Sequence, residues 1–323
     1  MELKFRADTG PALKRKENIM YATRETYGET LIALGEKYKN LVVLDADLAT
    51  ATKTIGFKNK FPDRFFDMGI AEQDLMGTAA GLALGGKIPF ASTFAIFATG
   101  RAYDQIRNTI CYSNLNVKIA ATHAGITVGE DGASHQALED IALMRAIPNM
   151  VVISPSDHVQ TKYLLEEAVT YNGPVYIRLA RPKTEEIYED GTTFKIGKAV
   201  CHGDGKNATI IATGVTVAEA LKAQKELKEK GVDVRVLDIH TIKPIDREAI
   251  VKAAMETEKI ITVEDHSIIG GLGSAVCEVL AEEYPKKVTR LGINDTFGQS
   301  GKWDELMKYY GITSEKIVET VQT

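Results

Sequence analysis

The sequence predicts an α/β protein of two domains, each built on a doubly wound parallel sheet. The chain has 323 residues, enough for two domains that each bury a core. Short, nearly continuous apolar runs recur along it, which is typical of strands covered on both faces, and helical patterns separate most of them. The runs span residues 41–44, 117–121, 150–153, 175–179, 208–212, 232–237 and 260–263.

The best-defined helix begins at Thr216, where Glu219 three residues later completes a capping box. Gly231 gives the stop signal. Between them, lysines occupy one face, as expected of a solvated helix surface. The opposite face, predicted to pack inward, comprises Val217, Ala220, Leu221, Gln224 and Leu227.

A polar, acidic stretch divides the chain. We place a linker at residues 183–193, between a first domain of residues 18–182 and a second of residues 194–323. Residues 1–17 form an N-terminal extension that is polar and basic and lacks the apolar core of a signal peptide.

Composition excludes several classes of partner. A net charge of −5 argues against nucleic acid and anionic membranes, although a few local cations can still form a pocket for an anionic small molecule. No apolar run approaches the roughly 18 residues of a membrane helix. Cys111, Cys201 and Cys277 lack metal-ligand spacing and are predicted to be buried thiols in a reducing cytosol. We expect a cytoplasmic protein with no metal site of its own.

Four unusual segments of the first domain follow predicted strands, and the carboxyl ends of parallel strands are the usual ligand sites of such folds. Glu72 lies between apolar stretches at the start of an Ala/Gly-rich helix, so we expect it to be partly buried. Phe94 and Phe97 share a helical face, for which core packing is the default explanation. The segments are 45–47 (DAD), 68–73 (MGIAEQ), 92–97 (STFAIF) and 122–136.

The segment 122–136 contains two histidines and two acids in a glycine-rich stretch. Either His123 or His135 alone could be structural, but such a loop is functional more often than not. Two other glycine-rich motifs are interpreted as structural. Residues 203–205 (GDG) lack the downstream asparagine of a metal-diphosphate motif, and residues 270–274 (GGLGS) lack the third glycine of a dinucleotide fingerprint.

Together, the four segments resemble the pyrimidine-binding domain of transketolases. The second domain, with KPID at 243–246 and VEDH at 263–266, resembles the family's C-terminal domain. The resemblance covers nearly the whole chain beyond the first twenty residues and is most specific at 69–72 and 129–136. It implies that this chain holds the aminopyrimidine of thiamine diphosphate, while a partner subunit binds the diphosphate and its Mg²⁺ or Ca²⁺.

The resemblance also implies a role for each candidate residue. Glu72 contacts N1′ of the aminopyrimidine and is a catalytic residue, as is His135, which reaches the reacting end of the substrate. The cofactor-binding residues are Asp47, Glu72, Phe94 and Phe97. The substrate-binding residues are Arg24, His123, Asp131, His135 and Arg181, of which Arg24, His123 and Arg181 supply three potential cations around the substrate phosphate.

The implied activity is transfer of a two-carbon ketol unit from a ketose phosphate to an aldose phosphate, in an α2β2 assembly with an N-terminal transketolase subunit. Residues 101–105 (RAYDQ) look more like deoxyxylulose phosphate synthases and the β subunits of 2-oxo acid dehydrogenases, whereas Thr122-His123 favours transketolase. Gly100 and Ala51 depart from the common pattern and leave the substrate open. A non-catalytic assembly or regulatory subunit is a further alternative, but Glu72 and the 122–136 segment are both retained.

Overall fold

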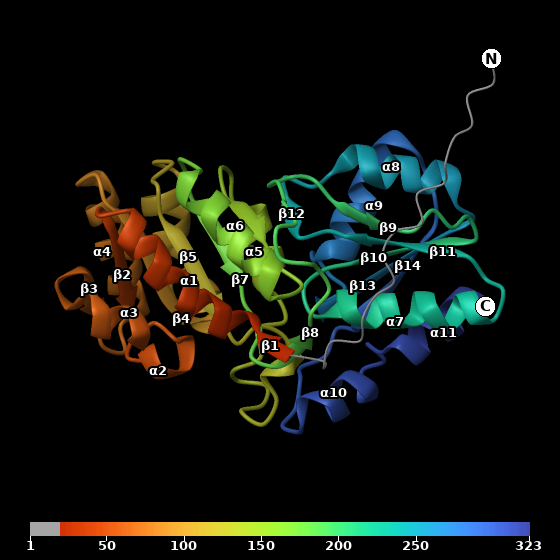
Figure 1. Cartoon of the computed structure of the whole chain (residues 1–323), viewed down its shortest axis with the longest axis horizontal. Helices are drawn as coiled ribbons and strands as arrows, with labels where there is room; N and C mark the ends of the chain where they lie inside the picture. Colours follow the sequence, from red (N-terminus) through yellow and green to blue (C-terminus); the bar gives the residue numbers. More distant parts are fainter. Residues whose placement is uncertain (1–19) are drawn as a thin grey trace, which may run out of the picture.

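The computed structural model describes residues 20–323, and the predicted N-terminal extension lies outside them. Two helix-flanked sheets lie side by side along the long axis of the molecule (Figure 1). This arrangement confirms the predicted α/β fold class with parallel-rich sheets. In the part of the chain that is described, no helix is both long enough and apolar enough to cross a membrane.

The first sheet has seven strands in the order β12-β6-β7-β5-β4-β2-β3, all parallel except for β12 at one edge. Its strands are β2 (Leu41–Asp45), β3 (Phe65–Asp67), β4 (Ile88–Phe94), β5 (Lys118–Thr122), β6 (Val151–Ile153), β7 (Val175–Arg178) and β12 (Thr241–Lys243). The helical segments around it are α1 (Thr23–Lys37), α2 (Ala49–Thr52), α3 (Ile55–Lys60), η1 (Pro62–Arg64), α4 (Glu72–Leu84), η2 (Phe97–Arg101), η3 (Gln105–Cys111), η4 (Ile126–Val128), α5 (Asp140–Ala146) and α6 (His158–Thr170).

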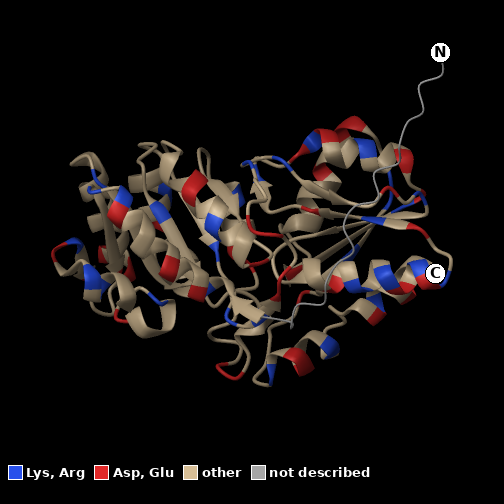
Figure 2. Ribbon diagram, viewed as in Figure 1, with Lys and Arg blue, Asp and Glu red and all other residues tan. Residues whose placement is uncertain are grey.

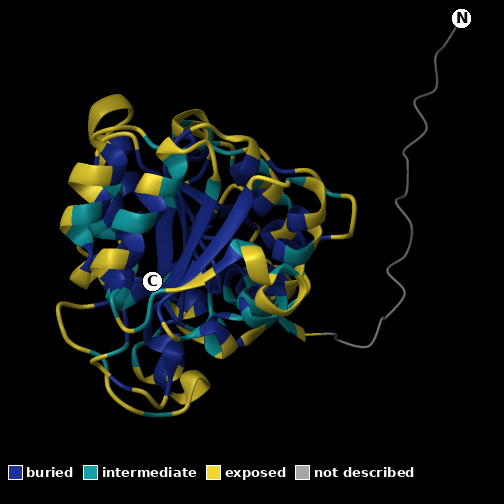
Figure 3. Ribbon diagram, turned by 90° about the vertical axis from the view of Figure 1, so that its left-hand side faces the viewer, coloured by how far each residue is buried: buried dark blue, intermediate teal, exposed yellow. Residues whose placement is uncertain are grey.

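Alternate strand residues enter different cores, which explains the continuous apolar runs. In β2, Val42 and Leu44 belong to a core that also contains residues of α4 and α5, whereas Leu41 and Val43 belong to a core that contains residues of α1, α3 and α6. Figure 3 shows the strands buried between helices whose outward surfaces are exposed. Both faces of the sheet are therefore covered, which leaves the strand ends as the place where polar side chains gather.

The second sheet has the order β14-β13-β10-β11-β9 and is parallel except for β9. Its strands are β9 (Val200–His202), β10 (Ala208–Ala212), β11 (Val234–Asp238), β13 (Lys259–Ser267) and β14 (Val288–Ile293). One core lies beneath α7, α10 and α11, and another beneath α8 and α9. These helices are α7 (Thr216–Glu229), α8 (Arg247–Glu256), α9 (Leu272–Glu283), α10 (Trp303–Tyr309) and α11 (Ser314–Gln322).

The junction between the domains is less simple than a linker. Strand β12 belongs to the second part of the sequence but pairs with β6 in the first sheet. Within residues 183–193, strand β8 (Lys183–Glu185) pairs with β1 (Met20–Ala22), and Tyr188 is buried and donates a hydrogen bond to Asp238 Oδ2 over 2.6 Å. The polar composition of residues 183–193 does not predict this packing, because it depends on Tyr188, whose hydrogen-bond partner Asp238 lies in the second domain.

Three local expectations were wrong or incomplete. The Thr216 hydroxyl donates to the Thr213 and Val263 carbonyls, and Glu219 accepts from the Ser314 amide, so the capping box does not form. Strand β4 is not among the apolar runs, because Pro89 and polar residues interrupt its pattern, and it extends through Phe94 into the segment that was expected to follow a strand. Cys201 is exposed and not buried, since its strand lies at the sheet edge.

Charged side chains are distributed over both domains. Figure 2 shows acidic and basic residues interspersed on the helices that flank the sheets, with few on the strands. On α7, for example, Lys222 and Lys230 each pair with a glutamate one turn away.

Acid sensitivity of the fold can be tested at His240, which follows β11. This histidine is fully buried, and burial lowers its pKa from 6.5 to about 4. Stability from its neutral form is present above the unfolded pKa near 6.5 and is lost as the pH falls toward the folded value. We expect His240→Gln to reduce the drop in unfolding free energy between pH 7 and pH 5 by about 2 kcal/mol, measured by urea denaturation. An equal drop in both proteins would contradict the assignment.

Candidate active site

Polar and aromatic residues meet at the carboxyl edge of the first sheet. Strands β2, β4, β5 and β7 are adjacent, and their registers bring their ends together. Asp47 follows β2, Phe94 ends β4, His123 follows β5, and Arg181 lies three residues beyond β7. Residues far apart in the sequence are thus neighbours at one edge of the sheet, the usual ligand position of parallel folds.

Glu72 begins helix α4 and is only 2% exposed. A carboxylate is favourable at a helix start, because the unpaired main-chain amides there carry a partial positive charge. Its Oε1 accepts a hydrogen bond from Arg101 Nη1 over 2.7 Å, and Arg101 is itself half exposed. The guanidinium carbon of Arg101 also lies 4.7 Å from the ring centroid of Phe97. The carboxylate is therefore engaged by a flat cation that rests on an aromatic face.

Aromatic rings link the Glu72–Arg101 pair to two histidines at this edge of the sheet. The rings of Phe94 and Phe97 are nearly parallel, with centroids 5.9 Å apart. His123 stacks on Phe94 at 3.8 Å, and His135 meets Phe97 edge-on at 5.4 Å. The expected core packing on a shared helical face is wrong: Phe94 ends strand β4, Phe97 is only partly buried, and neither belongs to the hydrophobic cores of the described residues. The two rings instead form a wall between Arg101 and the two histidines.

Arg24 and His123 are in direct contact, with Arg24 Nη1 3.0 Å from His123 Nε2. Burial, together with the nearby charges of Arg24 and Arg181, lowers the pKa of His123 to about 3. The imidazole is therefore neutral, with Nε2 accepting from Arg24 and Nδ1 donating to the Thr122 hydroxyl, 2.8 Å away. The cluster thus contains two arginine cations and a neutral histidine, in place of the three cations expected from the sequence.

The two arginines line one pocket of about 280 Å³. Arg24 has a lowered pKa because it is buried and lies near Arg181, and its buried Nε has no hydrogen-bond partner among the described residues. Arg181 donates to the Val128 carbonyl, and its Nη1 lies 3.1 Å from a Glu130 oxygen and 3.8 Å from Asp131 Oδ2. A pocket with two guanidinium groups and an unused buried donor is suited to an anionic group such as phosphate.

Asp47 lies apart from this pocket and is exposed. Its backbone is left-handed, with φ of 60°, and its amide donates to Asp67 Oδ1 over 3.2 Å. The neighbouring Asp45 is buried and accepts hydrogen bonds from Thr52 and Thr54, so it holds the loop that follows β2.

The two departures from the family pattern are both accommodated. A side-chain carbon at Gly100 would meet no atom within 4 Å, so its position is open. The Ala51 carbonyl accepts from Arg24 Nη1 over 3.1 Å, so position 51 still contacts the arginine cluster through its main chain.

Sequence reasoning missed several residues of this region. Arg101 drew attention only as part of a subfamily pattern, although it is the partner of Glu72. Lys183 and Trp303 line the same pocket as Arg24 and Arg181, and Trp303 belongs to the second domain. Neither carries a local motif that would have singled it out. Across residues 20–323, no group of three or more histidine, cysteine or acidic side chains is arranged to hold a metal ion.

Comparisons with known proteins identify both domains of the chain. The transketolase pyrimidine-binding domain matches residues 20–186, and the transketolase C-terminal domain matches residues 197–317. The chain belongs to the transketolase family. The resemblance predicted from the sequence is thereby confirmed, and membership implies dependence on thiamine diphosphate.

Relatives of this transketolase chain include half-length and full-length proteins. A chain from Methanocaldococcus jannaschii described as a transketolase C-terminal section is 58% identical over 92% of this chain and 94% of that protein. Transketolase of Homo sapiens is 41% identical over 93% of this chain but only 48% of its own length. A solved structure described as a split-gene transketolase in an inactive β4 tetramer is 53% identical, with a TM-score of 0.87 over 93% of this chain and 97% of that one.

Proposed function

We propose that this chain is the C-terminal subunit of a transketolase, which binds the aminopyrimidine of thiamine diphosphate and serves transfer of a two-carbon ketol unit between sugar phosphates. The observation that carries the proposal is the buried carboxylate of Glu72, which Arg101 links to the parallel rings of Phe94 and Phe97. A buried acid next to an aromatic wall suits a flat heterocycle with a basic ring nitrogen.

The Arg101 side chain supports the fit of such a ring. Its planar, nitrogen-bearing guanidinium contacts Glu72 and covers Phe97, which is how an aminopyrimidine would be held by the same two groups. When bound, thiamine diphosphate supplies a nucleophilic carbon and accepts the electron pair released when a bond beside a carbonyl breaks. Glu72 would hold a proton against ring nitrogen N1′, while Phe94 and Phe97 exclude water.

The substrate side of the proposal uses the arginine pocket. Arg24 and Arg181 would bind the substrate phosphate, with neutral His123 orienting Arg24 through their 3.0 Å contact. Asp131 and His135 lie in the 122–136 segment, where His135 meets the ring of Phe97 edge-on. Both would contact the donor sugar, with His135 near its reacting end. Asp47, which follows β2, would lie near the thiazolium side of the cofactor, as in the family that the chain resembles.

A partner subunit is part of the proposal. We infer that an N-terminal transketolase subunit binds the diphosphate through Mg²⁺ or Ca²⁺, in an α2β2 assembly. Two comparisons support this: the chain matches only half of human transketolase, and a similar split-gene chain in a β4 tetramer is described as inactive.

The test is an assay of the purified complex of this chain with an N-terminal transketolase subunit, thiamine diphosphate and Mg²⁺. We expect transfer from a ketose phosphate to an aldose phosphate. Condensation of pyruvate with an aldose phosphate, with release of CO2, would instead identify the deoxyxylulose phosphate synthase reaction. Decarboxylation of a 2-oxo acid with transfer of its acyl group to a disulfide acceptor, which is reduced, would identify the dehydrogenase alternative. A complex without any of these activities would favour a non-catalytic subunit.

Arg181 provides a test of phosphate recognition. Replacing Arg181 with alanine removes one of the two guanidinium groups of the pocket, so the KM for phosphorylated donors should rise about ten- to a hundredfold. The KM for hydroxypyruvate, a donor without phosphate, should hardly change. Steady-state kinetics with both donors measure the difference, and equal losses on both would assign Arg181 a structural role.

A further inference from the structure

The second domain contacts the glycine-rich loop (residues 125–136) that carries Asp131 and His135. The contacts occur near both ends of the loop. At its end, Gln136 Nε2 donates to the Gln299 carbonyl over 3.0 Å. At its start, the first turn of the loop donates hydrogen bonds to the carboxylate of Asp265, which lies in β13.

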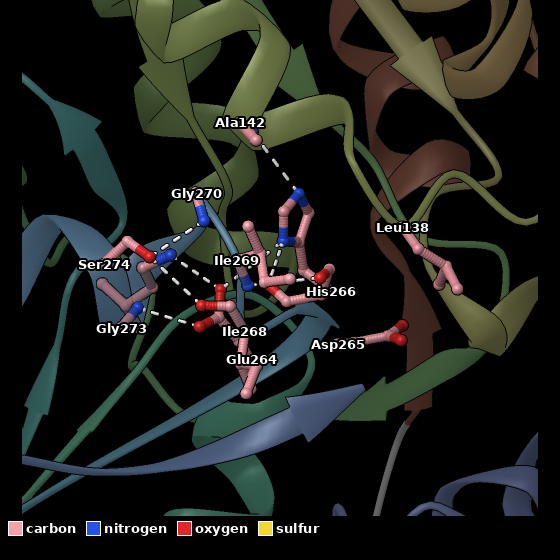
Figure 4. A network of polar contacts seen from close by, with 12 residues as sticks. Leu138, Ala142, Glu264, Asp265, His266, Ile268, Ile269, Gly270, Gly273 and Ser274 are labelled. Carbon is pink, nitrogen blue, oxygen red and sulfur yellow. Dashed lines mark hydrogen bonds and ion pairs between the residues drawn. The ribbon is translucent and has the colours of Figure 1, made fainter. Parts of the chain in front are cut away.

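Asp265 is buried and makes three hydrogen bonds to two successive loop residues. Its Oδ1 accepts from the Ile126 amide over 2.8 Å, and its Oδ2 accepts from the Thr127 amide over 3.4 Å and the Thr127 hydroxyl over 2.7 Å. Figure 4 shows Asp265 pointing away from its neighbour Glu264, whose carboxylate caps α9 by accepting from the Leu272 and Gly273 amides. Of these two adjacent acids, Glu264 therefore makes hydrogen bonds within the second domain, whereas Asp265 makes them to the first domain.

The loop is shaped for this carboxylate. Gly125 has a left-handed φ of 76°, and a side-chain carbon there would lie 2.1 Å from Asp265 Oδ2. Only glycine permits both the backbone conformation and the close approach. The contact therefore depends both on Asp265 in the second domain and on a glycine at position 125 in the first.

The turn held by Asp265 leads directly to the arginine pocket. The next residue, Val128, offers its carbonyl to Arg181, which also contacts the acids at 130 and 131. Arg178, in strand β7 just before Arg181, donates from Nη2 to the Asp265 carbonyl over 2.8 Å. Asp265 thus connects the loop to the end of the strand that carries Arg181.

We propose that Asp265 is a positioning residue of the active site, which holds the start of the glycine-rich loop so that Arg181 faces the substrate phosphate. The inference rests on the proposed function, in which Arg181 binds that phosphate. Through Asp265 the C-terminal domain takes part in substrate recognition by way of the loop, in addition to Trp303, which lines the pocket itself.

The test uses Asp265→Asn in the complex with the N-terminal subunit. Asparagine keeps the size of the side chain but offers one acceptor oxygen to three donors, so the loop start is released. We expect the KM for a phosphorylated donor to rise roughly tenfold, the scale of a lost hydrogen bond to a charged group. The ratio of the KM for the phosphorylated donor to the KM for hydroxypyruvate should rise by that factor, because Gln136 still holds the end of the loop that carries His135. A merely structural role would lower activity toward both donors alike.

Two further variants control for damage to the fold. Asp238→Asn makes the same substitution at another fully buried carboxylate of the second domain, which accepts from Ser156 and Gln160 of the first domain and makes no hydrogen bond to the loop. It should lower the melting temperature without changing the ratio of KM values for the two donors. Thr127→Val removes one donor to Asp265, the Thr127 hydroxyl, and should raise the KM ratio of the two donors by a smaller factor than Asp265→Asn. It therefore tests the same contact if Asp265→Asn does not fold.

The double variant separates this inference from the function on which it rests. If Asp265 acts through Arg181, adding Asp265→Asn to Arg181→Ala should give little further rise in KM. Failure of Arg181→Ala alone to distinguish the donors would overturn phosphate binding by Arg181. A selective effect of Arg181→Ala, with none from Asp265→Asn or Thr127→Val, would overturn the positioning role and leave the proposed function intact.

Discussion

Replacing Glu72 with glutamine should reduce turnover of the complex by about 10²- to 10⁴-fold, the range usual for general acid–base groups. The amide keeps the size of the side chain and can still accept the Arg101 hydrogen bond, now made over 2.7 Å. It cannot exchange a proton with a ring nitrogen. The fold should therefore change little while the chemistry is lost.

The measurement combines steady-state kinetics with thermal unfolding of the same preparations. Asp74→Asn is the matched control, because Asp74 is an exposed acid in the same first turn of α4 and should tolerate the change. Retention of more than about a tenth of wild-type kcat by Glu72→Gln would argue against a proton-transfer role for this residue.

The isolated chain should neither bind thiamine diphosphate tightly nor catalyse transfer. The pyrimidine site offers one carboxylate and two phenylalanine rings, and a bound ring must displace Arg101 from Glu72. These contacts are too few to offset the freedom that the cofactor loses on binding. Most of the cofactor's charge is on its diphosphate, which in the proposal is bound by the partner subunit through a divalent cation.

Calorimetric titration of the chain with cofactor and Mg²⁺, with and without the N-terminal subunit, measures this directly. Arg101→Ala is the informative companion variant. If Arg101 alone kept the cofactor out, its removal would permit tight binding without a partner, whereas we expect that only the partner restores it. Micromolar affinity of the wild-type chain alone, accompanied by transfer between sugar phosphates, would overturn the dependence on a partner.

Local sequence was sufficient for most regular elements of this protein. The run at residues 208–212 is strand β10, and the helix that starts at Thr216 is α7, because burial on both faces and amphipathic spacing leave strong local patterns. Local motifs also identified the family, and the burial expected of Glu72 is observed. The capping box expected at Thr216 does not form because tertiary partners, not local preference, determine the contacts of Thr216 and Glu219.

What the sequence determined by itself was the α/β fold class, the family and the residue types available for chemistry, since each depends on neighbours along the chain. The tertiary structure decided how those residues act. Glu72 is paired with Arg101, His123 is held neutral by burial and two arginines, and Asp265 reaches across the domains to a loop 138 residues away in sequence. Distance and dielectric environment control these interactions, and both are set only when segments remote in the chain pack together.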